Sequence, residues 1–497
     1  MASATVPTTV GAVPLESGSN WRMGLLICFG ALLLRLIAAA LFFGSVDTIN
    51  LIKNSITLVE GKSVLLPYFP TVNALIWLGG VLAAYTPLPF PLCLKLVPIL
   101  FDSLIAALVY ELVARTVPGL ATRAGWLYAV CPVALLINGF HGHWDSIALF
   151  FLLLGFAFRS GNGLGGEFLF GLSFSVSLLV KPIALPFLLL VWPRKDAHSK
   201  SIWGALAGLS AGFATAFTIF TVAGFSLLDT LIGIVSYSAK GVQVFGLPFA
   251  PGLAQVAIQN YRLAWVIPGM IAVAVLYHRG KLTATDSMLL FYLFTLGTSG
   301  LSPQYLLWPL PLLLISGRLR LASFYTAVAT LFLLLYYMNP WASYFPFENL
   351  AIFAPMRGLA WLLPPAAMAA RGLLPFVHAM GNFVFPVCAL IVAFLLAKRP
   401  LPADFEEHWS ARWVYMSPAG IIAAAVLVAR VVINQQYVRS RISEIWNQLP
   451  AQYAMHVQSL NPAPIFVADF GSFGPANVVL LLGLITAAWC LAAFSEG

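Results

Sequence analysis

Apolar runs of helix length recur along the chain, and they limit the possible fold more than any other feature. The first covers residues 23–43 and the last covers residues 478–494. A spanning helix needs about 20 mostly apolar residues, because each residue advances it by about 1.5 Å. The alternation that marks the strands of a membrane barrel is missing from these runs. The sequence therefore predicts an all-α polytopic membrane protein with about 12–14 spanning helices.

The composition excludes a soluble enzyme of this size. Of the 497 residues, 61% are hydrophobic and 9% are charged, which is more apolar surface than one soluble core can bury. The net charge of +9 indicates cytoplasmic loops rich in Lys and Arg rather than a nucleic-acid partner. All five cysteines lie in apolar runs, and we expect them to be buried small hydrophobes rather than disulfides or metal ligands.

The positions of the arginines predict an orientation. Arg115 and Arg123 bracket a short loop that we place in the cytoplasm. The run 124–138 then leads outward, so the loop 139–145 is expected on the external side. Residues 71–85 are too few for a span, and we expect a half-inserted or membrane-surface helix there.

Two opposite charges lie at similar depths inside predicted spans. Arg35 belongs to the run 23–43, and Asp102 belongs to the run 92–115. A charge within a membrane is costly and is often functional, so we expect these two side chains to face each other. The pair either ties the two helices together or belongs to the functional site. Arg35 could alternatively extend to the membrane surface.

The remaining polar residues gather on one predicted face. With the orientation above, the external side carries Asp47, His141, His143, Asp145, Lys181, Lys240, Gln304 and Tyr305. A carboxylate there can deprotonate a hydroxyl, and cations can hold a phosphate leaving group. A polar chamber open to one side suits an enzyme with a lipid-linked substrate better than a channel.

Structural interpretations of these residues remain open at this point. Asp47 could cap the following helix, and Lys181 could be a lysine that reaches the surface. The spacing of His141, His143 and Asp145 has enough ligands for a metal, although we expect none. Residues 302–305 could be no more than a helix start.

The order of these motifs resembles the GT-C superfamily of integral-membrane glycosyltransferases. The matching pieces are Asp47 after the first span, "EGKSVLLPYFP", "KLVPILFDSLIAALVYEL", "NGFHGHWDSIALFFLLLG", "SLLVKPIALPFLLL" and "LSPQYLLWPLPLLL". They extend from residue 35 to about residue 316. Within the superfamily, the chain is similar to bacterial enzymes akin to the mannosyltransferases that use lipid-phosphate mannose.

The chain is expected to have three regions. Residues 1–20 are small and polar, and we expect a disordered tail there. The resemblance implies that residues 21–317 are a GT-C-like catalytic transmembrane module and that residues 318–497 are a variable C-terminal transmembrane region. It places the protein in a bacterial inner membrane, with the active site on the extracytoplasmic side and with surface helices in the first external loop.

The resemblance also implies an inverting, cofactor-free transfer of a hexose from a polyprenyl-phosphate donor, with mannose as the implied sugar. Asp47 would be the general base, and a lipid, glycan or protein hydroxyl would be the acceptor. Lys181, with Arg35 or Lys240, would hold the phosphate, and His141, His143 and Asp145 would shape the sugar or acceptor site. Gln304 and Tyr305 are further candidates for substrate binding. Many members have paired acids in the first loop, whereas Thr48 follows Asp47 here. The second acid is then Asp102 or Asp145.

Two other functions fit the same residues. A transporter or flippase of a lipid-linked glycan would line a path to both faces with charges. A glycan ligase or polymerase would favour several arginines on the external side, and few of the arginines before Arg357 are expected there.

Overall fold

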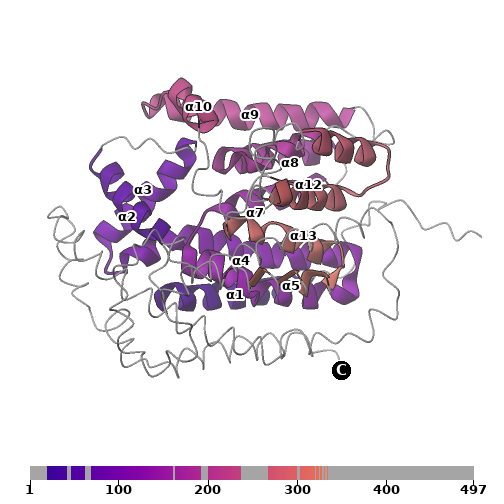
Figure 1. Ribbon diagram of the computed structural model, residues 1–497, viewed down its shortest axis with the longest axis horizontal. Coiled ribbons are helices and arrows are strands. Elements are labelled where there is room, and N and C mark those ends of the chain that lie inside the picture. Colours follow the sequence, from indigo (N-terminus) through magenta and orange to yellow (C-terminus); the bar gives the residue numbers. More distant parts are fainter. Residues whose placement is uncertain are drawn as a thin grey trace, which may run out of the picture.

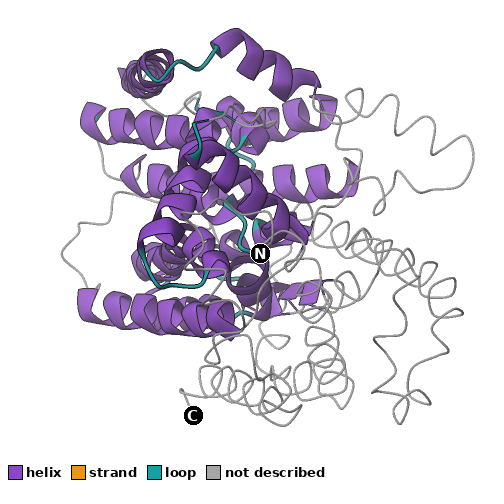
Figure 2. Ribbon diagram, turned by 90° about the vertical axis from the view of Figure 1, so that its left-hand side faces the viewer, coloured by secondary structure: helices purple, strands orange, loops and turns teal. Residues whose placement is uncertain are grey.

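The computed structural model describes residues 20–41, 46–61, 69–159, 163–191, 200–236, 267–298 and 303–319, and parts of 321–333. Every regular element within these ranges is a helix (Figure 2). This confirms the all-α class. The predicted N-terminal tail, Lys240 and the spans expected after residue 333 lie outside the described residues.

The elements follow one another in chain order. They are α1 (Trp21–Leu41), α2 (Val46–Val59), α3 (Pro70–Tyr85), α4 (Phe90–Thr116), η1 (Pro118–Leu120), α5 (Ala121–Ala129), α6 (Pro132–Ala134), η2 (Leu135–His141), α7 (Asp145–Arg159), α8 (Leu164–Val180), η3 (Pro182–Leu190), α9 (Lys200–Val222), α10 (Leu227–Ser236), a helix Ile267–His278, α12 (Ala284–Thr298), η5 (Pro303–Leu307) and α13 (Pro309–Ile315).

Four helical segments within the described ranges are long and apolar enough to cross a membrane. They are Trp21–Ala40, Phe90–Thr116, Pro118–His141 and Ile202–Val222. Their positions agree with predicted spans. The chain is therefore a helical membrane protein, while the total of 12–14 spans depends on residues outside those described.

The long helices form a stack in which the chain runs back and forth. Figure 1 shows α9, α8, α7, α4 and α1 lying one below another, and each helix contacts its neighbour in this order. Arg115 and Arg159 lie at one end of the stack, where they donate hydrogen bonds to the carbonyls of Ala157 and Leu190. The segments that carry Asp47, His141 and Lys181 lie at the opposite end.

Helices α2 and α3 cover that opposite end (Figure 1). At 16 residues α3 is too short to span a membrane, as predicted for residues 71–85. Helix α2 has two faces, since Leu51 and Ile52 are buried while Asp47 and Lys53 are exposed. Its apolar face packs on residues of α3, α4 and α7 in one buried cluster, which fixes the position of Asp47.

Two elements of the structure differ from the prediction. The run 124–138 is not one helix, because it breaks at Cys131 and continues from Pro132 through η2. Proline has no N–H to donate and interrupts the helical hydrogen bonds. The sequence also did not predict helix α10, because its short apolar run is too weak a signal by itself.

Helices α8 and α9 meet through glycines. Gly204, Gly208 and Gly212 are spaced four residues apart and so share one face of α9. A Cβ at Gly208 would lie 2.0 Å from the carbonyl oxygen of Phe168, and one at Gly171 would lie 1.9 Å from that of Ala205. Small residues at such a seam allow two backbones to approach closely.

We expect Gly208→Ala to lower the thermal unfolding midpoint in detergent, because its methyl group meets backbone that cannot move aside. Overpacking of this kind costs about 1–3 kcal/mol. Gly165→Ala is the matched control, since nothing lies within 4 Å of the added Cβ. Equal midpoints for the two variants would contradict the close approach of α8 and α9.

Candidate active site

The centre of the polar end is the carboxylate of Asp145, the first residue of α7. Lys181 Nζ lies 2.6 Å from its Oδ1 and 2.7 Å from its Oδ2. Trp308 Nε1 donates to Oδ1 at 2.7 Å, and His143 Nδ1 lies 2.5 Å from Oδ2. Both oxygens are therefore occupied, and the side chain is fully buried.

The electrostatics keep Asp145 ionised. Burial alone would raise the pKa of Asp145, but the charges of Lys181 and His143 and their hydrogen bonds hold it well below its usual range. Burial lowers the pKa of His143, and Asp145 only partly offsets that effect. The 2.5 Å contact with Oδ2 fits His143 Nδ1–H donating to the carboxylate.

A tight turn places the two histidines. His141 ends η2, a π-helical segment, and Gly142 follows with φ +73°. Glycine adopts this left-handed conformation without strain, and a Cβ would lie 2.6 Å from Lys95 Cγ. The segment 139–145, predicted to be a loop, is thus helical over residues 139–141, and all seven residues are buried.

Asp47 contacts this turn from α2. Its Oδ2 lies 3.2 Å from His141 Nε2, and Thr48 donates a hydrogen bond to the carbonyl of His141. The Asp47 side chain is 53% exposed, whereas that of His141 is 3% exposed. Burial of the site would raise the pKa of Asp47, but the hydrogen bond from His141 and the charges of His141, His143 and Lys181 lower it below its usual value.

These contacts form one continuous row. The rings of His141 and His143 stack with centroids 5.5 Å apart, so Asp47, His141, His143, Asp145 and Lys181 follow one another through space. The row brings together five residues that the sequence placed on one face. Asp47 is its exposed end, and the Asp145–Lys181 pair is its buried end.

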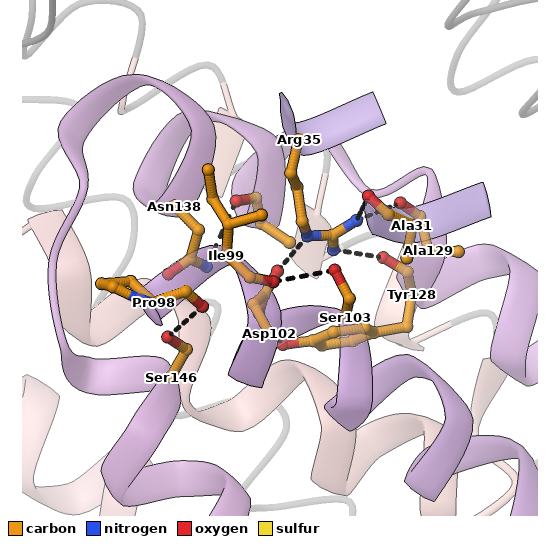
Figure 3. A network of polar contacts seen from close by, with 11 residues as sticks. Ala31, Arg35, Pro98, Ile99, Asp102, Ser103, Tyr128, Ala129, Asn138 and Ser146 are labelled. Carbon is orange, nitrogen blue, oxygen red and sulfur yellow. Dashed lines mark hydrogen bonds and ion pairs between the residues drawn. The ribbon is translucent and has the colours of Figure 1, made fainter. Parts of the chain in front are cut away.

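Arg35 and Asp102 form a separate buried network (Figure 3). Arg35 Nε donates to Asp102 Oδ2, which confirms that the two charges face each other. Arg35 also donates to the carbonyls of Ala129 at 2.7 Å and Tyr128 at 3.4 Å, and Tyr128 Oη donates to Asp102 Oδ1 at 2.6 Å. All of these partners are protein groups, so the contacts favour the structural alternative, a tie between helices.

Three residues of the segment 303–308 border the site. Lys181 Nζ lies 4.8 Å from the Tyr305 ring centroid and 6.0 Å from that of Trp308, within cation–π range. Gln304 is 9% exposed, and its Oε1 has no hydrogen-bond partner in the described structure. Such a buried acceptor suits a ligand hydroxyl or a water molecule.

The sequence analysis did not identify Trp308, Tyr128 and Lys95 as neighbours of the two networks. A buried Trp or Tyr usually hydrogen-bonds through its polar atom, which was a weak signal for the first two. A charge within a predicted span, as at Lys95, does not by itself place that side chain beside Gly142.

No group of three or more His, Cys, Asp or Glu residues in the described part of the chain is arranged to hold a metal ion. His143 is instead directed at Asp145, and His141 at Asp47.

Comparisons of the chain with known protein families, with curated proteins and with solved structures found no match.

The Asp145–Lys181 pair gives a double-mutant test. Removing one partner of a buried ion pair costs about 3–5 kcal/mol, because the other charge is left uncompensated. We therefore expect Asp145→Asn and Lys181→Met each to lower the unfolding midpoint strongly. The double variant should lose less than the sum of the two, as measured by tryptophan fluorescence in detergent.

The matched control is the pair Glu111 and Arg115, whose side chains are 28% and 33% exposed. Neutralising that pair should change stability by about 0.5 kcal/mol at most. Additive losses at Asp145 and Lys181 would show that the two charges do not stabilise each other.

Proposed function

We propose that the protein is an inverting glycosyltransferase that moves a hexose, most simply mannose, from a polyprenyl-phosphate donor to an acceptor hydroxyl. Residues 21–317 would form its GT-C-like module, and Asp47 would be the general base. No cofactor takes part in this scheme. The acceptor is a lipid, a glycan or a protein.

The observation that carries the proposal is the contrast between three carboxylates. Asp102 and Asp145 are fully buried, and both oxygens of each are bound by protein groups. Asp47 is half exposed, at the end of a buried polar row. A general base must reach the proton that it removes, and Asp47 meets that requirement among these three.

The chemistry follows from this placement. Asp47 accepts the proton of the acceptor hydroxyl while that oxygen attacks the anomeric carbon from the side opposite the phosphate. The bond between the anomeric carbon and the phosphate oxygen breaks, and its electron pair leaves with the lipid phosphate. One displacement inverts the anomeric centre.

The departing phosphate needs positive partners. Lys181 gives two of its three N–H groups to Asp145, which leaves one for an anion. The charges of Lys181, His141 and His143 all act on Asp47, so a phosphate beside Asp47 meets the same field. Arg35 is engaged in its own network, and Lys240 lies outside the described residues.

The distribution of charge supports an extracytoplasmic site. Arg115, Arg159 and Arg318 lie at the end of the stack away from the site, and cytoplasmic ends of membrane proteins carry most of the Lys and Arg. The site would then open to the outer face of the inner membrane, where the lipid-linked donor and membrane lipids meet it.

We expect Asp47→Asn to lose transfer of labelled mannose from polyprenyl-phosphate mannose to a membrane acceptor extract by about 10²–10⁴-fold, the usual contribution of a general base. Asparagine keeps the shape of the side chain but cannot take the proton. Donor binding, followed by native mass spectrometry, should persist.

Lys53→Gln is the matched control, because Lys53 is exposed on the same helix and should leave transfer unchanged. Full activity of Asp47→Asn would remove Asp47 from the mechanism. Movement of the intact lipid-linked sugar across vesicles, without transfer, would identify a flippase.

Orientation can be measured by cysteine labelling in intact cells. Lys53→Cys lies at the site end, and Gly119→Cys lies at the arginine end, where Gly119 is exposed. We expect an impermeant maleimide to label Lys53→Cys directly and Gly119→Cys only after permeabilisation. The unsubstituted protein gives the background of the native cysteines, and the reverse pattern would place the site in the cytoplasm.

A further inference from the structure

We propose that Tyr292 and Gln304 bind hydroxyl groups of the donor hexose and so select the sugar that the protein transfers. This inference rests on the proposed function. It gives a role to Tyr292 of α12, a residue that the proposed mechanism does not otherwise use, and it defines what Gln304 binds.

Each of the two side chains carries a buried polar atom without a partner. Tyr292 is 3% exposed and Gln304 is 9% exposed. Neither Tyr292 Oη nor Gln304 Oε1 has a hydrogen-bond partner among the described residues. Folded proteins leave few buried polar atoms unpaired, so two of them near one site indicate a ligand or an ordered water.

Aromatic packing holds Tyr292 beside the Asp145–Lys181 pair. Its ring packs edge-on against those of Trp308 and Phe187, with centroids 4.7 Å and 4.6 Å apart. Trp308 in turn donates its Nε1–H to Asp145, and the charge of Asp145 acts on the Tyr292 hydroxyl. The ring is thus fixed by its neighbours, which keeps the hydroxyl in one place for a ligand.

Gln304 approaches the same pair from η5. The next residue, Tyr305, has its ring centroid 4.8 Å from Lys181 Nζ. The segment η5 also contacts η2, which ends at His141, and α7, which begins at Asp145. The two unpaired atoms therefore border the buried end of the polar row from two different elements.

The unpaired atom of Gln304 favours a hydroxyl over a phosphate. Oε1 only accepts hydrogen bonds, and so do the oxygens of an ionised phosphate, so the two cannot pair. A sugar hydroxyl can donate to Oε1, and the Tyr292 hydroxyl can both donate and accept. In the proposed reaction the hexose is bonded to the phosphate that Lys181 holds. Its hydroxyls then lie within one sugar ring of Lys181, where these two atoms are.

The test uses polyprenyl-phosphate mannose and four analogues that each lack one sugar hydroxyl, at C2, C3, C4 or C6. Dissociation constants, measured by native mass spectrometry, decide the outcome, because removing a hydroxyl also changes the reactivity of the sugar. We expect the wild-type protein to bind at least one analogue about tenfold or more weakly than the mannose donor, since the missing hydroxyl leaves a buried polar atom unpaired.

Tyr292→Phe removes one oxygen and keeps the ring, and Gln304→Leu removes the amide. We expect each variant to bind the mannose donor about tenfold more weakly and to lose the discrimination against the analogue that lacks its own hydroxyl. Discrimination against the other analogues should persist. A change that only perturbed the fold would weaken all five donors by one factor. Gln304→Met replaces Gln304→Leu if the latter does not fold.

Tyr325→Phe is the matched control, because Tyr325 is also buried but its hydroxyl donates to the carbonyl of Leu306 at 2.9 Å. We expect Tyr325→Phe to lower the thermal unfolding midpoint of the donor-free protein and to keep the wild-type discrimination. Tyr292→Phe should not lower that midpoint, since its hydroxyl has no protein partner.

Two results would overturn the sugar-binding role. One is a wild-type protein that binds all five donors equally. The other is a wild-type pattern of discrimination in both Tyr292→Phe and Gln304→Leu. If Tyr292→Phe also lowered the midpoint as far as Tyr325→Phe does, its hydroxyl would belong to a structural water site instead.

These failures are separable from a failure of the proposed function. If Asp47→Asn abolishes transfer while the variants of Tyr292 and Gln304 keep the wild-type discrimination, the enzyme assignment stands and only the sugar site is wrong. If the wild-type protein neither binds nor transfers from polyprenyl-phosphate mannose, both are wrong.

Discussion

The arrangement of the polar end depends on how one buried carboxylate is satisfied. Asp145 accepts hydrogen bonds from Lys181, Trp308 and His143, which belong to three segments far apart in the sequence. An ionised group in so apolar a protein is tolerated only when its partners compensate for the lost water. The hydrogen bonds of Asp145 therefore hold α7, the α8–η3 junction and the start of α13 together. The turn that carries His141 and His143 is held in place by the same contacts.

The charged residues of the protein divide into two kinds of site. Arg35 with Asp102, and Lys181 with Asp145, are closed pairs whose partners are protein groups. Asp47 is different, because its carboxylate is half exposed on an amphipathic helix that covers the end of the bundle. Acid–base chemistry requires an accessible carboxylate whose surroundings are held in place, and the buried ion pairs provide that support for Asp47.

Much of this structure follows from the sequence, and the exceptions have physical reasons. The helix class, the turn between Arg115 and Arg123 and the Arg35–Asp102 contact were predictable, since hydropathy and charge patterns extend over many residues. The turn at Gly142 was not, because a π-helical segment and a left-handed glycine are local features without periodicity. The sequence also could not show that both carboxylate oxygens of Asp145 are hydrogen-bonded, since one donor, Trp308, is 163 residues away in the chain. The sequence thus indicated which residues lie close together. The role of each acid could be assigned only from the hydrogen-bond partners that its carboxylate has in the structure.

Arg35 has a consequence for how the protein is made. Its partners are Asp102 on α4 and the carbonyls of Tyr128 and Ala129 at the end of α5, where Pro132 interrupts the helix. Until those segments leave the ribosome, α1 carries an uncompensated guanidinium that disfavours insertion by about 2.5–3.5 kcal/mol. The first helix would then stay beside the translocon until about a hundred more residues have been synthesised, and the three helices would enter the bilayer as one unit.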